Sequence, residues 1–504
     1  MAALFAAPLL YLLIRNAGDP GELAAAVSSE RALAALRRTV LLAAAVSASA
    51  AAVGTLAAWL VVRTDLPGRR VWRVVLPLPL VIPSFIGAFA LIAAFAPGGL
   101  FGGVADVRGF AGAFLVLTLL TYPYVYLPVA ARLGQLPGSL EESARLLGRR
   151  GGATFVSIVL PQLRGAILAG GLLVFLYCVS DFGAVQLLRY DTLTRTIYST
   201  RLLDQPTSLA LSLELGVLAL AVVAAERAFA PGRHVESSRG RPVEVGLGAW
   251  RLPALAIVGT TVALALAAPV AVLGYWAWRG LTSGSERASS VATDLSSLVG
   301  PALNTAGVSV AAAMIALVAV LPVAYLTVRR RGPLAEGANA VVVGGFALPG
   351  LAIALALVFW TLGAPWPIGA AYQTLSLLLF AYVVHFGAQT LRAAQVAVAG
   401  IPAELEEAAS ALGAGRVRRY FRVELPLMAP ALGAGAGLVL LSTMKELPAT
   451  LLLAPPGFHT LATTIWTSTE DAFIADASIA SLLLIALSGV LTWLLLFRAG
   501  RYEV

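Results

Sequence analysis

The stretch TVLLAAAVSASAAAVGTLAAWLVV (39–62) contains no charged residue and is longer than the roughly 20 residues with which an α-helix crosses a bilayer. The stretch TAGVSVAAAMIALVAVLPVAYLTV (305–328) has the same character. Of the 504 residues, 59% are hydrophobic and 12% are charged, which is about half the charged fraction usual in soluble proteins. One such stretch could be a buried core helix, but several of them predict a polytopic membrane protein.

Hydrophobic stretches recur along the chain and predict an all-α fold with about 12 transmembrane helices. They lie near residues 2–14, 39–62, 74–96, 109–131, 166–188, 207–225, 253–275, 302–328, 340–362, 372–391, 428–453 and 477–497. Most of the 35 Lys and Arg fall in alternate loops, an asymmetry that places the basic loops in the cytoplasm. We therefore expect both termini in the cytoplasm and interpret the Arg-rich segments 63–73 and 329–331 as inner-surface anchors.

The net charge and the Cys and His content argue against nucleic-acid binding, disulfide bonding and a metal site. The same inner-surface placement explains the net charge of +9, so no nucleic-acid partner is needed. The single cysteine, Cys178, excludes an intrachain disulfide and lies in an apolar stretch, where packing is its expected role. His234, His385 and His459 are scattered without metal-ligand spacing, so no metal site is assigned. No catalytic residue is predicted.

The second half of the sequence repeats the first. EESARLLG (141–148) matches EEAASALG (406–413), and YDTLTRTIY (190–198) matches FHTLATTIW (458–466). At nearly the same separation, Thr39, Arg63 and Pro83 match Thr305, Arg329 and Pro349. An even number of spans in each half gives both halves the same orientation, so the repeat is parallel.

The repeat divides the chain into three parts. We expect a first transmembrane repeat at 1–225, a polar cytoplasmic linker at 226–252 and a second transmembrane repeat at 253–504. We expect both repeats to be embedded in the lipid bilayer.

Each repeat carries a short charged segment in a predicted cytoplasmic loop. In the second, Leu405, Ala408, Ala409 and Leu412 follow the spacing of one helical face, and Gly413 suits a helix C-terminus. This pattern predicts a short amphipathic helix at the membrane surface.

An alternative for the first charged segment is purely local. Ser139 and Glu142 form a capping box, in which Glu142 only closes the start of its own helix. The second copy has Glu404 in place of that serine and keeps Glu407, so capping does not explain both copies. Two copies related by a two-fold axis suit a symmetric partner with two subunits.

These segments resemble a known loop. E-S-A-x-x-x-G-x9-I-x-L-P (142–161) and E-A-A-x-x-x-G-x9-V-x-L-P (407–426) resemble the EAA loop of ATP-binding-cassette (ABC) importer permeases. Residues 181–198 and 444–466 are most similar to the fused iron(III) permease subfamily. The resemblance implies that loops 137–161 and 402–426 each dock in a groove of an ATPase subunit. The coupling residues it implies are Glu142, Ala144, Gly148, Glu407, Ala408, Ala409 and Gly413.

The resemblance also implies the partners. A P-loop needs Lys followed by Ser or Thr after a glycine-rich turn, but the only lysine, Lys445, lies inside a span. The chain is therefore expected to carry no cofactor and to be no enzyme, with ATP and Mg²⁺ on a separate ATPase dimer. An extracytoplasmic substrate-binding protein is the other expected partner, and the bacterial cytoplasmic membrane is the expected location.

Two matching carboxylates are candidates for the translocation path. Asp181 and Glu446 occupy corresponding positions, and Lys445 precedes the second. An ionisable residue inside a span costs about 2.5–3.5 kcal/mol, so it usually faces the bundle interior or water. The alternative is that both carboxylates sit at helix ends in water, with Lys445 neutralising Glu446.

The leading hypothesis is uptake of iron(III). A hard cation prefers oxygen ligands, which the two carboxylates offer. Thiamine, 2-aminoethylphosphonate and polyamine permeases share the same loops and remain alternatives. A secondary transporter would need more intramembrane charge, and a membrane-embedded enzyme would need a catalytic arrangement that the sequence does not contain.

Overall fold

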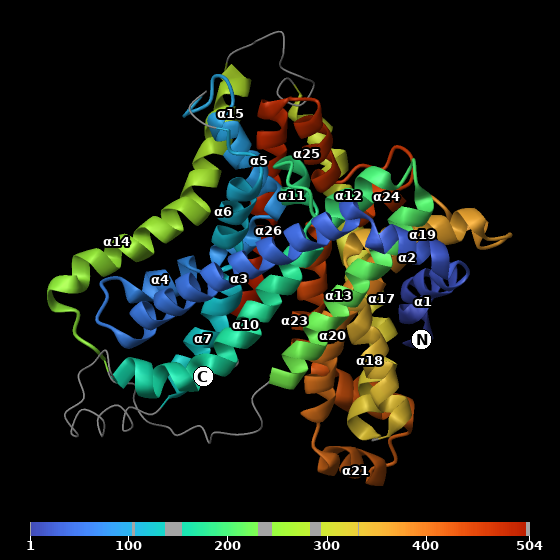
Figure 1. The fold of residues 1–504 in the computed structure, drawn as a ribbon. Coiled ribbons are helices and arrows are strands. Elements are labelled where there is room, and N and C mark those ends of the chain that lie inside the picture. The colour runs from blue at the N-terminus through green and yellow to red at the C-terminus, as the bar shows by residue number, and fades with distance from the viewer. Residues whose placement is uncertain are drawn as a thin grey trace. The chain divides into compact units, whose positions relative to one another are not determined.

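The computed structural model describes residues 2–102, 106–136, 154–229, 244–282, 294–330 and 332–499 (Figure 1). Within these ranges the regular structure is helical, and the β-type pairing consists of one isolated bridge, between Thr64 and Val245. The predicted all-α fold class is confirmed. The chain forms two compact units, one made of Met1–Ser29, Ile197–Val217 and Ala277–Val504, the other of Glu30–Thr196 and Leu218–Trp276.

The predicted spans all have helical counterparts. In the described part of the chain, nine helical stretches are long and apolar enough to cross a membrane. They are Glu30–Arg63, Phe110–Gln135, Phe155–Ser180, Gln205–Ala225, Gly248–Thr282, Leu295–Arg329, Leu375–Ala399, Arg416–Met444 and Ile474–Leu494. Two bent helix pairs and the shorter apolar helix α1 (Ala2–Ala17) account for the remaining predictions.

The spans predicted at 74–96 and 340–362 are not straight helices. The first consists of α4 (Arg69–Val75), a 3-10 turn and α5 (Ser84–Phe95), with a bend of 91°. The second consists of α18 (Pro333–Ala347) and α19 (Gly350–Gly363), with a bend of 102°. Pro83 and Pro349 precede α5 and α19 with extended backbones, and a proline has no N–H with which to continue a helix. The matching prolines therefore break both spans at equivalent places.

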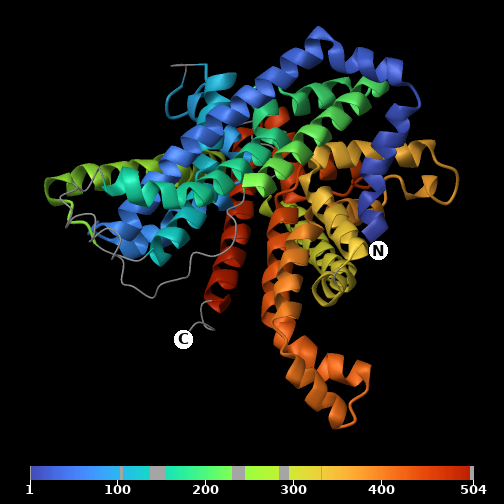
Figure 2. The same ribbon diagram turned by 60° about the horizontal axis from the view of Figure 1, so that its bottom comes forward.

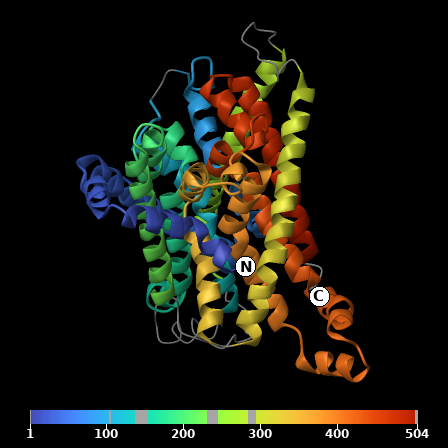
Figure 3. The same ribbon diagram turned by 90° about the vertical axis from the view of Figure 1, so that its right-hand side faces the viewer.

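In the unit that contains Ala277–Val504, three long helices form the core. These are α17 (Val299–Arg329), α20 (Leu375–Ala399) and α23 (Leu425–Met444), which pack along one another (Figures 1 and 3). A Cβ added at Gly435 of α23 would lie 2.6 Å from Ala393 Cβ of α20. Small residues thus let these backbones approach closely, as is usual between membrane helices.

The other unit repeats this packing with α3 (Glu30–Arg63), α7 (Pro123–Gln135) and α10 (Leu160–Ser180). A Cβ added at Gly170, the counterpart of Gly435, would lie 2.7 Å from Val125 Cα of α7. Gly54 of α3 is equally close to the backbone of α7 and the residue before it. The repeat seen in the sequence is thus also a repeat in helix packing.

The shorter helices follow the same order in both halves. After α10 come α11 (Gly183–Leu187), α12 (Leu193–Thr200) and α13 (Gln205–Phe229). After α23 come α24 (Pro448–Leu453), α25 (Leu461–Glu470) and α26 (Ile474–Ala499).

The matched threonines make matched hydrogen bonds. Thr39 Oγ1 accepts from the backbone N–H of Leu193 at 2.8 Å, and Thr305 Oγ1 accepts from that of Leu461 at 2.8 Å. Each bond closes the start of the following short helix, where backbone N–H groups have no partner within the helix.

The described end of the predicted linker contacts the end of α3. The backbone N–H of Val245 donates to the carbonyl of Arg63 at 2.8 Å, and Arg251 forms an ion pair with Asp65. The hydrogen bond from Arg251 lowers the pKa of Asp65 below its ordinary value. The first residues of the predicted linker, 226–229, end the helix Gln205–Phe229, and residues 230–243 lie outside the described residues.

Candidate coupling loop and intramembrane carboxylates

The charged segment of the second repeat is a short helix, as predicted. Helix α21 (Ala403–Ala411) begins after Pro402, and Gly413 follows it with φ +77°. That left-handed conformation favours glycine because it has no Cβ. Figure 2 shows this segment, in orange, projecting beyond the ends of α20 and α23. The helix is therefore presented away from the core of its unit.

Two arginines tie α21 to neighbouring helices. Arg329, at the end of α17, forms an ion pair with Glu406. Arg419, on the short helix α22 (Arg416–Arg419), donates from Nη1 to Ser410 Oγ at 3.3 Å. One edge of α21 is thus held by α17 and by α22.

Arg419 is itself held by a buried carboxylate. Glu424 is 4% exposed, and its Oε1 accepts from Arg419 Nε at 2.8 Å. Its Oε2 accepts from the hydroxyl of Tyr325, on α17, at 2.6 Å. Buried charges are stable when they are paired and hydrogen-bonded, and both oxygens of Glu424 satisfy this condition. We call Tyr325, Arg419 and Glu424 the anchoring triad.

The opposite edge of α21 is uncovered. Glu407 and Ala408 are exposed, Ala409 is half-buried, and Leu412 is 89% exposed. Leu405 is 42% exposed and Val417, on α22, is 72% exposed. A helix fixed along one edge, with apolar and acidic side chains free on the other, is suited to receive another protein.

The first loop is described only in part. Glu142, Ala144 and Gly148 lie outside the described residues. The residue just before this loop, Leu136, is contacted by Arg63 of α3. Arg63 is 1% exposed and donates from Nη2 to the carbonyl of Leu136 at 3.0 Å. Arg63 is therefore buried, in contrast to the surface anchor predicted from the sequence.

Asp181 lies where α10 ends. It is 7% exposed, and its Oδ1 accepts from the backbone N–H of Ala184 at 3.1 Å and of Val185 at 3.4 Å. The carbonyl of Asp181 accepts from Thr194 Oγ1 at 2.7 Å. The span predicted at 166–188 therefore breaks at this carboxylate, which caps the short helix α11.

Glu446 occupies the corresponding place after α23. Its Oε1 accepts from the backbone N–H of Ala449 at 3.2 Å, and its carbonyl accepts from Thr450 Oγ1 at 2.6 Å. Glu446 and Lys445 are both half-buried. The two carboxylates thus share one structural role, which is to cap a short helix that follows a broken span.

The residues beside the two caps differ. Ser84, the first residue of α5, interacts through its hydroxyl with Asp181. Its counterpart is Gly350, where an added Cβ would lie 2.6 Å from Glu446 Oε1. Glutamate is one methylene longer than aspartate, so its carboxylate fills the space that the serine side chain takes in the first half.

A model of the family described as the inner membrane component of binding-protein-dependent transport systems matches residues 50–234 and again residues 317–501. The chain belongs to this family. The two matches include both charged loops and both capping carboxylates, so the permease consists of two family domains fused in one chain. It is the membrane-spanning permease of an ABC importer.

Two relatives cover most of the permease, and a third covers a quarter of it. The Fe(3+)-transport system permease protein FbpB 2 of Haemophilus influenzae is 30% identical over 467 residues, which are 91% of this chain and 89% of that protein. The probable ABC transporter permease protein y4fN of Sinorhizobium fredii is 25% identical over 84% of this chain and 80% of its own length. A putative 2-aminoethylphosphonate transport system permease protein, PhnV of Salmonella typhimurium, is 35% identical over 128 residues, 25% of this chain.

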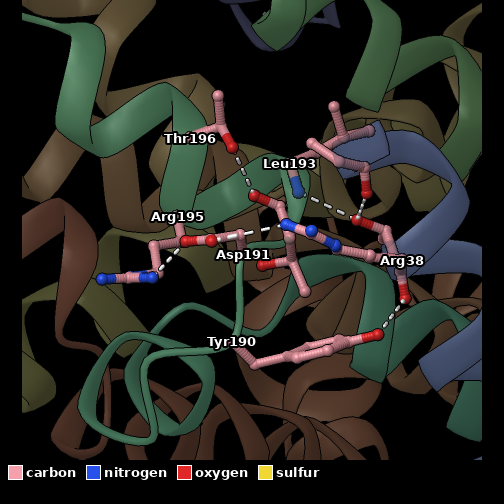
Figure 4. A network of polar contacts seen from close by, with 9 residues as sticks. Arg38, Tyr190, Asp191, Leu193, Arg195 and Thr196 are labelled. Carbon is pink, nitrogen blue, oxygen red and sulfur yellow. Dashed lines mark hydrogen bonds and ion pairs between the residues drawn. The ribbon is translucent and has the colours of Figure 1, made fainter. Parts of the chain in front are cut away.

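Two polar clusters of the permease are not predictable from its sequence patterns. The anchoring triad joins residues that lie 99 positions apart in sequence, and only the ionisable Glu424 at the start of a span was a signal for it. The second cluster is shown in Figure 4, where Asp191 forms ion pairs with Arg38 and Arg195. It surrounds the bond between Thr39 and Leu193 and reinforces the same contact between α3 and the start of α12.

Proposed function

We propose that the permease imports iron(III) delivered by an extracytoplasmic binding protein. The observation that carries this proposal is the similarity, over 91% of the chain, to the Fe(3+)-transport permease of Haemophilus influenzae. The membrane is the bacterial cytoplasmic membrane, with both termini in the cytoplasm. Residues 1–225 and 253–504 form the two transmembrane repeats, and 226–252 join them.

The driving force comes from a separate ATPase dimer. The exposed edge of α21, with Glu407, Ala408 and Leu412, enters a groove on one ATPase subunit. The loop 137–161, with Glu142, Ala144 and Gly148, takes the equivalent place on the other subunit. ATP and Mg²⁺ bind to those subunits, and their closure moves the two loops together. The permease itself carries no cofactor and catalyses no reaction.

Asp181, Glu446 and Lys445 are the candidates for the translocation path. Support comes from their position at two broken spans, because irregular backbone at membrane depth is tolerated where it lines a cavity or is buried in protein. Capping explains the hydrogen bonds of both carboxylates equally well. Charge removal separates the two roles, since an amide still accepts a hydrogen bond from a backbone N–H.

Calorimetry on the partner binding protein tests the substrate. We expect it to bind iron(III) citrate, with no binding of thiamine or 2-aminoethylphosphonate. Binding of an organic ligand without iron would refute iron(III) import while leaving the ABC importer in place. The phosphonate is the second candidate, since the PhnV relative reaches the higher identity, although over a quarter of the chain.

A further inference from the structure

We infer that Tyr124, Tyr177 and Asp181 form a transit site for a hard trivalent cation. The inference rests on the proposed import of iron(III) and adds the residues that would bind it in the first repeat. We call these three residues the oxygen site.

Three elements bring the oxygen site together. Tyr124 is on α7 and Tyr177 is on α10, and their ring centroids are 5.8 Å apart. Asp181 follows Tyr177 by four residues, which places it on the same side of the helix end. Ser84 interacts through its hydroxyl with both Tyr177 and Asp181, so their oxygen atoms lie around one small group.

The surroundings favour a polar ligand. Tyr124 and Tyr177 are half-buried, whereas Asp181 is nearly fully buried. Two hydroxyl groups and a carboxylate facing hydrocarbon would be costly, because lipid offers no hydrogen-bond partner. Their partly accessible side is therefore expected to face water or a passing solute.

Charge decides which solute fits. A carboxylate and two phenolates carry three negative charges, which balance one trivalent cation. A neutral complex avoids most of the desolvation free energy that a bare trivalent ion would cost on leaving water. All three donors are hard oxygen ligands, as such a cation prefers. Binding replaces the two phenol protons by the metal and releases both protons to water.

The second repeat offers no equivalent site. Ser442 stands at the position of Tyr177, and its hydroxyl is bonded to Gln389. Gln389 itself stands at the position of Tyr124, and the cationic Lys445 adjoins the remaining carboxylate, Glu446. The site therefore belongs to the first repeat alone, and the two halves of the path differ in charge.

The experiment uses the full-length permease with its ATPase in lipid nanodiscs. Titration with iron(III) nitrilotriacetate is followed by visible absorption, where a phenolate bound to iron(III) gives a charge-transfer band. We expect the band in the wild type and in Tyr190→Phe, a matched control whose ring also packs within this unit. Tyr177→Phe should lower the apparent affinity at least about tenfold, since loss of even an outer partner at a metal site costs about 10- to 100-fold.

Iron uptake by the same variants distinguishes the two proposals. One outcome is that the wild type imports iron(III) without a phenolate band and that the double variant Tyr124→Phe/Tyr177→Phe imports it equally well. The oxygen site is then wrong, and the proposed function stands. If the wild type imports another solute and no iron(III), the proposed function is wrong, and the oxygen site as an iron site is wrong with it. Should the double variant fail to assemble, the single variants, which each keep one of the two hydroxyl groups, decide the question.

Discussion

Replacing Arg419 tests whether the anchoring triad positions α21, the helix proposed to dock on the ATPase. Arg419→Gln leaves the carboxylate of Glu424, whose side chain is 5% exposed, without its cation, while Tyr325 still donates to it. Arg418→Gln, on the same short helix, is the matched control because it removes the same charge from an exposed side chain.

The size of the effect follows from burial. Removing one partner of a fully buried ion pair costs about 3–5 kcal/mol. The side chain of Arg419 is 26% exposed and one hydrogen bond to Glu424 remains, so we expect about 1.5–3 kcal/mol, the range for a hydrogen bond to a charged group. If this loss appears fully in docking, affinity for the ATPase falls about 10- to 150-fold.

Two measurements on nanodisc-embedded permease check this prediction. Thermal unfolding gives the loss of stability, and titration with the ATPase dimer gives the loss of affinity. Adding Glu424→Gln to Arg419→Gln should restore part of both, because it removes the uncompensated charge. The reasoning is refuted if Arg419→Gln matches Arg418→Gln within about 0.5 kcal/mol and the double variant is additive.

Three further predictions concern the caps and the matched contacts. Asp181→Asn keeps an acceptor for α11 and should assemble normally, whereas Asp181→Ala should lose about 0.5–2 kcal/mol of unfolding free energy. If Asp181→Asn and Glu446→Gln both import iron(III) normally, the role of these carboxylates in the translocation path is excluded. Gly350→Ala places a Cβ 2.6 Å from Glu446 Oε1 and should cost about 1–3 kcal/mol in thermal unfolding, while Gly433→Ala, with open space around it, should not destabilise the protein. Thr305→Val leaves the buried N–H of Leu461 without its acceptor and should cost about 1–3 kcal/mol of stability. Thr305→Ser keeps the hydroxyl and should unfold at nearly the wild-type temperature. Equal unfolding temperatures for the two variants would contradict the contact.

The fold followed from the sequence because its signals are local. An uncharged stretch such as 39–62 fixes a span by length, and Gly413 marks a helix end by its backbone preference. The bends at Pro83 and Pro349 were missed because hydropathy continues through them. Proline in a membrane helix gives either a kink or a break, and packing decides between the two.

The site was less predictable because its contacts are long-range. Arg329 reads as a topological anchor, yet it pairs with Glu406 across 77 positions in sequence. Tyr124 and Tyr177 read as ordinary aromatic residues of spans, and only the packing of α7 on α10 brings their rings together. A single sequence records which residues are present, but the partner of a polar side chain depends on the folded arrangement of helices.

Uptake by proteoliposomes tests the central claim most directly. The permease, its ATPase dimer and the binding protein are reconstituted, and radioactive iron(III) is supplied with ATP inside or outside the vesicles. The account predicts iron accumulation that requires ATP on the coupling-loop side and the binding protein on the other, and that falls when Glu407 is replaced by alanine. Iron accumulation without the ATPase, or ATP-driven uptake of another solute but not of iron(III), would contradict it.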